Sequence, residues 1–118
     1  GGAPDELTLE LAQLIAEGSR ASRTAFLAKL ETQKVTRDDL SSLFEGTRLL
    51  LSSALLGQYG VSVPERDLRI ARSLASRLTK AKLLGTIDLL QDYRNKCTYN
   101  VGVGPTLGGI AVELEETL

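Results

Sequence analysis

Residues 36–60 read TRDDLSSLFEGTRLLLSSALLGQYG, and this stretch decides the fold class. Thr36 and Asp39 have the spacing of a capping box, in which each side chain accepts a hydrogen bond from the other residue's backbone N–H. Apolar residues then recur at helical spacing as far as Gly60, and glycine is typical of helix ends. The pattern predicts a helix over about 37–59, the longest of the chain.

This predicted helix is apolar on two sides. At about 100° per residue, one side carries Leu40, Leu43, Phe44, Thr47, Leu50, Leu51, Ala54 and Leu55. Leu49 and Leu56 fall on the opposite side. A helix with two apolar faces is usually surrounded by neighbours. We therefore expect this helix to be central, and Leu49 and Leu56 to be candidates for contact with a partner chain.

Five further segments show helical periodicity and helix start or stop signals. They span about 5–18, 22–30, 64–78, 80–99 and 105–118, and the last two of the chain's prolines, Pro64 and Pro105, suit a first turn. No run of β-branched residues is long enough for a strand. The sequence predicts one all-α domain over residues 5–118, a five- or six-helix antiparallel bundle.

The last predicted helix carries a clean apolar face. Leu107, Ile110 and Leu114 share this face, together with Ala111 and Leu118, while the glutamates lie off it. An apolar face must be buried on something. Leu107, Ile110 and Leu114 are therefore further candidates for a partner interface, although packing inside the domain would satisfy them equally well.

Length and composition are those of an ordinary globular domain. The chain has 118 residues, 42% of them hydrophobic, and its 14 basic and 15 acidic side chains give a net charge of −1. This balance is not that of a dedicated nucleic-acid binder. There is no apolar run of membrane-spanning length and no signal peptide. We expect a cytoplasmic protein that does not contact membranes.

The start of the chain suggests a fragment. No Met is present, and the chain opens with Gly1-Gly2-Ala3-Pro4. We expect residues 1–4 to be a cloning remnant or linker in front of a domain taken from a longer protein.

Catalytic chemistry finds little support in the residue types. The chain has no His, which removes the commonest general base and zinc ligand. The single Cys97 falls on an apolar stripe and is expected to be a core thiol. The acidic pairs 38–39 and 115–116 are expected to be solvated. We expect no catalytic residue, no metal site and no cofactor.

The glycine-rich stretch over residues 102–109, GVGPTLGG, precedes a predicted helix, and helix starts bind phosphate. It lacks the spacing of a dinucleotide fingerprint and the Gly-Lys-Ser/Thr ending of a P-loop. An enzyme that uses this corner remains a third hypothesis. The simpler interpretation is a corner where small residues let two helices approach closely.

One charge asymmetry stands out. Between residues 66 and 82 the basic side chains are Arg66, Arg69, Arg72, Arg77, Lys80 and Lys82, and the one acid is Asp67. Arg66, Arg69, Arg77 and Lys80 lie opposite the apolar stripe of the predicted helix. This basic face is a solvated surface, a contact for an acidic protein, or a contact for nucleic-acid phosphates.

The C-terminal third carries a resemblance. Residues 89–103 read LLQDYRNKCTYNVGV, followed by Leu107, Ile110 and Leu114. A polar and basic helix that ends in an Asn turn at Asn100, followed by a helix rich in Leu and Glu, resembles the C-terminal collar domain of bacterial DNA polymerase III clamp-loader subunits. Delta prime is the most similar of these subunits, with gamma/tau as its paralogue. Gly102 stands where the family usually has a second Asn.

The resemblance implies a function. Collar domains of this family pack side by side and hold the clamp-loader subunits in a ring, while ATPase modules elsewhere open the sliding clamp for DNA replication. The expected partners are the gamma/tau and delta subunits, and the domain would contact DNA only indirectly, through the full complex. The alternative is a small helical nucleic-acid-binding module that uses the basic face.

Overall fold

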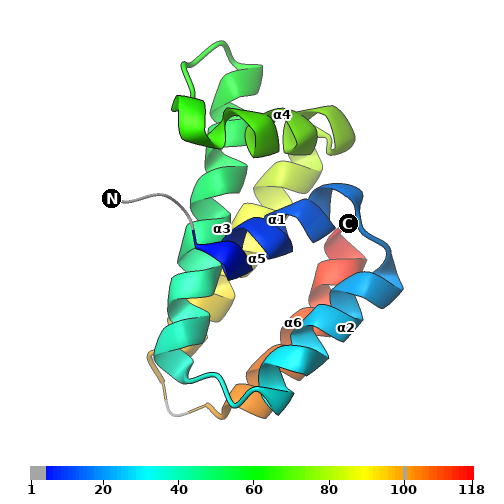
Figure 1. The fold of residues 1–118 in the computed structure, drawn as a ribbon, viewed down its shortest axis with the longest axis vertical. Coiled ribbons are helices and arrows are strands. Elements are labelled where there is room, and N and C mark those ends of the chain that lie inside the picture. Colours follow the sequence, from blue (N-terminus) through cyan, green and yellow to red (C-terminus); the bar gives the residue numbers. More distant parts are fainter. Residues whose placement is uncertain (1–4, 100) are drawn as a thin grey trace.

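The computed structural model describes residues 5–99 and 101–118, so the predictions for residues 1–4 and for Asn100 lie outside it. The described residues form six α-helices and one short 3-10 helix, and they contain no strand. The elements are α1 (Glu6–Glu17), α2 (Arg20–Thr32), α3 (Arg37–Gln58), η1 (Glu65–Asp67), α4 (Leu68–Arg77), α5 (Lys80–Lys96) and α6 (Val103–Thr117) (Figure 1).

Side-chain caps explain where most helices begin. The Asp5 carboxylate accepts from the backbone N–H of Thr8 at 2.8 Å. Thr36 and Asp39 form the predicted capping box of α3, and Ser19 forms another with Ser22 at α2. Each such cap satisfies backbone donors that the first turn leaves free. α3 ends where Gly60 takes a φ of +81°, a conformation that a residue without Cβ adopts without strain.

Two antiparallel pairs of helices build the domain. α3 and α5 form one pair, and α2 and α6 form the other (Figure 1). α1 and α4 lie across the α3/α5 pair instead of along it. The expected antiparallel packing thus holds within the pairs, whereas the six helices do not share one bundle axis.

The core fills the space between these elements with leucine and a few aromatic side chains. α3 is central, as predicted, and it contacts α1, α4 and α5. Phe44 is fully buried and meets the Tyr93 ring edge-on, with centroids 6.5 Å apart. Cys97 is also buried, as expected, and burial raises the pKa of its thiol.

Several predicted helix boundaries were wrong. α2 begins at Arg20 because Ser19 supplies the cap, whereas the sequence prediction placed its start near Ser22. Pro64 precedes a 3-10 turn, so α4 begins four residues later than Pro64. α5 ends at Lys96, and α6 begins at Val103, with Pro105 inside its first turn.

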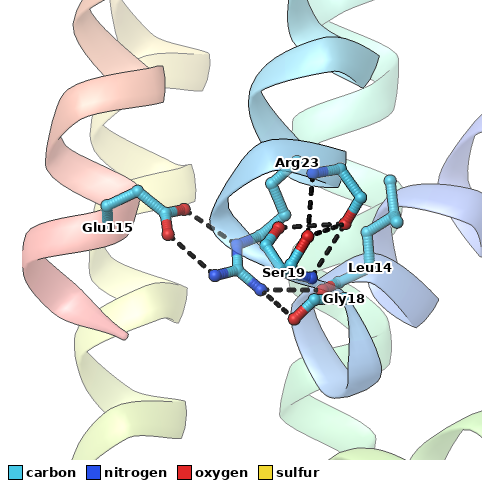
Figure 2. Close-up of polar contacts among 6 residues, drawn as sticks. Leu14, Gly18, Ser19, Arg23 and Glu115 are labelled. Atoms are coloured by element: carbon cyan, nitrogen blue, oxygen red, sulfur yellow. Dashed lines mark hydrogen bonds and ion pairs between the residues drawn. The ribbon is translucent and has the colours of Figure 1, made fainter.

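An ion pair ties three helices together where the ends of α1 and α6 meet the start of α2 (Figure 1). Arg23 of α2 donates from Nε and Nη2 to the Glu115 carboxylate of α6 at 2.8 and 2.7 Å (Figure 2). Its Nη1 donates to the carbonyl oxygens of Leu14 and Gly18 at the end of α1. The prediction that Glu115 is simply solvated was therefore wrong, because its side chain is 12% exposed and paired.

The glycine-rich stretch is a close-packing corner, the simpler of its two interpretations. Gly109 lies in α6 directly against Tyr93 of α5, whose hydroxyl donates to the Glu113 carboxylate. A Cβ at Gly109 would stand 2.6 Å from the Tyr93 hydroxyl oxygen, whereas one at Gly108 would meet nothing within 4 Å. Gly109 is therefore needed for the approach of α5 and α6, and Gly108 is not.

We expect Gly109→Ala to lower the free energy of unfolding by about 1–3 kcal/mol, because Tyr93 is buried and cannot move aside without strain. Gly108→Ala is the matched control in the same helix, and we expect it to add about 0.5–1 kcal/mol through better helix propensity. Urea denaturation of both variants measures the difference. Equal effects of the two substitutions would contradict this packing.

Candidate protein interface

The strongest candidate for a functional site is an apolar surface on the central helix and its antiparallel neighbour. Four large apolar side chains there are well exposed: Leu49 by 52%, Leu56 by 48%, Tyr59 by 65% and Leu84 by 49%. Leu49 and Leu56 lie on α3, Tyr59 caps its C-terminal end, and Leu84 lies on α5. We call these four residues the α3/α5 apolar face.

Two contacts between the helices show that these residues share one side of the molecule. At one end, the Lys80 ammonium lies 4.1 Å from the centroid of the Tyr59 ring. At the other end, Arg94 pairs with Glu45 at 3.3 Å. Leu84 follows Lys80 by one helical turn, and Leu56 precedes Tyr59 by about one turn. Leu56 and Leu84 therefore lie near the Lys80–Tyr59 contact, and Leu49 lies two turns before Leu56 on the same side of α3.

Charged groups border this face rather than interrupt it. Arg48 donates to the Glu45 carboxylate at 2.6 Å, and this bond holds the pKa of Glu45 below its ordinary value. Glu45 thus stays ionised between Arg48 and Arg94. A paired polar border around exposed apolar side chains is the usual composition of a protein interface.

The predicted partner surface on the last helix is not open. α6 packs on α2 and α5, and Leu107, Ile110 and Leu114 are all buried in the chain's own core. The prediction for these three residues needs correction, because their apolar face is already covered within the domain.

We expected neighbouring helices to surround α3, but the structure leaves the side that carries Leu49 and Leu56 uncovered. α5 lies on one side of these residues and α1 with α4 on the other, so both leucines remain at the surface. They therefore remain the candidates for contact with a partner. Sequence reasoning missed Tyr59 and Leu84. The exposure of Leu84 could have been predicted, because this residue falls outside the apolar stripe that Leu83, Ile87 and Leu90 form along the same helix.

A hollow of ≈ 410 Å³ adjoins the face where Leu49 meets α1 and η1. Ser42 and Ser53 line it, and so does Asp67, which is 8% exposed. In residues 5–99 and 101–118, no group donates a hydrogen bond to the buried Oδ1 of Asp67, whose contact with Arg66 is 3.8 Å long. The hollow therefore offers polar acceptors next to the apolar face.

The predicted basic face divides between two helices. Arg66, Arg69 and Arg77 are exposed on the outer side of η1 and α4, with Arg72 beside them. Lys80 belongs to α5 and lies against Tyr59, so it borders the apolar face instead of extending the arginine row. The break between α4 and α5, at Leu78 and Thr79, causes this separation.

Neither a metal-binding cluster nor a membrane-spanning helix is found in the described part of the chain. No three His, Cys, Asp or Glu side chains there are grouped so that they could hold a metal ion. None of the described helices is both long enough and apolar enough to cross a bilayer.

Comparison with known proteins adds no identification. The chain matches no family model, no curated protein sequence and no solved structure.

Proposed function

We propose that this domain works by binding other protein chains, as a collar-type assembly domain of a clamp loader similar to that of delta prime. The observation that carries the proposal is the α3/α5 apolar face. Four large apolar side chains on α3, its C-cap and α5, each about half exposed or more, are the kind of surface that marks a protein contact.

Two features support the collar type in particular. The regular secondary structure of the described residues is all helical, and the last two helices have the order that the resemblance implies, a polar helix followed by one rich in Leu and Glu. The proposed partners are the gamma/tau and delta subunits, next to which the domain would stand in a ring. In this proposal the domain performs no catalytic step, and its role in DNA replication is to assemble the clamp loader.

Charge reversal on the apolar face tests the proposal. We expect Leu49→Glu with Leu56→Glu to weaken binding to a gamma/tau collar domain at least tenfold, because binding would then bury two unpaired carboxylates. Titration calorimetry measures the affinity, and the melting temperature checks that the exposed substitutions leave the fold intact.

The matched control places the same two charges on other sides of the molecule. Leu9 of α1 and Val112 of α6 are also exposed apolar residues, and Leu9→Glu with Val112→Glu should leave the affinity within about twofold. An equal loss in both double variants would show that α3 and α5 do not form the contact.

A further inference from the structure

The arginine row on α4 is independent of the apolar face. The row consists of Arg69, Arg72 and Arg77, all exposed on the outer side of the helix. In the described part of the chain, none of these three guanidinium groups lies within 4.0 Å of a carboxylate, whereas Arg23, Arg48 and Arg94 are all ion-paired. The positive charge of the row is therefore available to a ligand.

The neighbourhood of the row is polar, and α4 itself carries no acidic residue. Between the arginines, α4 exposes Ser76 and partly exposes Ser73, while its apolar residues Ala71 and Leu74 are buried. Three acids lie nearby: Asp67 is buried beside Arg66, Glu65 is exposed four residues before Arg69, and Glu17 accepts a hydrogen bond from the Ser73 hydroxyl at 2.8 Å. All charges that α4 itself carries are therefore positive, on a protein whose net charge is −1.

We propose that the arginine row binds the phosphate backbone of duplex DNA. Arg69, Arg72 and Arg77 are about 4.5 and 7.5 Å apart along the helix axis, so the row spans about 12 Å, over which one DNA strand carries several phosphates at a rise of about 3.4 Å each. Guanidinium groups match phosphate oxygens in geometry, and hydroxyl groups such as that of Ser76 also contact phosphates.

The surface fits a duplex better than a single strand or an acidic protein. α4 carries no aromatic side chain on which an unpaired base could stack, and single-strand binding relies on such stacking. Its fully exposed residues are all arginine or serine, with Ile70 only half-buried beside them, whereas the energetic centre of a protein interface is usually a large aromatic or apolar side chain. The binding is expected to be independent of base sequence.

The salt dependence of DNA binding provides the test. The intact chain is titrated with a labelled duplex of mixed sequence at several salt concentrations. Three phosphate contacts predict a slope of log K against log salt of about −2.7, so that binding weakens about 40-fold between 50 and 200 mM salt. Arg69→Gln, Arg72→Gln and Arg77→Gln together should abolish this binding without changing the melting temperature.

A triple variant of equal charge is the control. Arg20, Lys29 and Lys34 are exposed on and after α2, and replacing them by Gln lowers the net charge by the same three units. This variant should keep the affinity and the slope. No duplex binding at 50 mM salt, an equal loss in both triple variants, or tighter binding of single strands or polyglutamate would each overturn the proposal. None of these outcomes depends on assembly with a partner subunit.

Discussion

Phe44→Ala is expected to lower the free energy of unfolding by about 3–5 kcal/mol, the cost of deleting a large, fully buried side chain from a close-packed core. Phe44 lies on α3 with no exposed surface and supports the Tyr93 ring of α5 edge-on. Its removal leaves a cavity at the contact between the two longest helices. Chemical denaturation, monitored by helical circular dichroism, measures the loss.

An exposed aromatic residue at the C-terminal cap of the same helix provides the control. Tyr59 is 65% exposed, and its main partner is the Lys80 ammonium. Tyr59→Ala should cost less than about 1 kcal/mol. A small effect at Phe44, comparable with that at Tyr59, would contradict the central position of α3.

Arg23→Met is expected to cost about 3 kcal/mol, because it leaves Glu115 without its partner in a position that is largely shielded from water. It also removes the donor to the carbonyl oxygens of Leu14 and Gly18. Methionine retains an unbranched stem of similar length, so the packing loss is small. Arg48→Met is the control, since the Arg48–Glu45 pair is more exposed and within one helix, and it should cost at most about 1 kcal/mol.

The same ion pair predicts a pH dependence. The hydrogen bond from Arg23 holds the pKa of Glu115 below its ordinary value of 4.5. The pair therefore stabilises the fold fully above that value, and the stabilisation is lost as the pH falls through the lowered pKa. Between about pH 5 and pH 2 the parent chain should lose more stability than Arg23→Met. Identical pH profiles would show that the pair does not form in solution.

Local signals made most of the fold predictable. Thr36 with Asp39, and Asp5 with Thr8, act over three residues, so the starts of α3 and α1 could be identified from sequence spacing. The inner stripe of α3 was likewise predicted correctly, because burial of Leu40, Phe44 and Leu51 follows the helical period. These features depend on neighbours along the chain and on little else.

The features that were not predicted depend on tertiary contacts. Arg23 and Glu115 are 92 residues apart in sequence, and no local pattern pairs them. Periodicity predicted an apolar face on α6 and a second apolar face, with Leu49 and Leu56, on α3. In the structure α2 and α5 cover the face of α6, whereas Leu49 and Leu56 are exposed. Which of two apolar faces is covered depends on how the helices cross, and sequence periodicity carries no information on that crossing.

Association with other chains is the central claim, and the molar mass of the mixed domains tests it most directly. Gel filtration with light scattering would compare this chain alone, the chain mixed with gamma/tau and delta collar domains, and the same mixture with the Leu49→Glu, Leu56→Glu variant. We predict a joint species that contains this chain, lost in the variant and retained with Leu9→Glu, Val112→Glu. A chain that elutes at 12.7 kDa in every mixture, at concentrations well above micromolar, would contradict the assembly function.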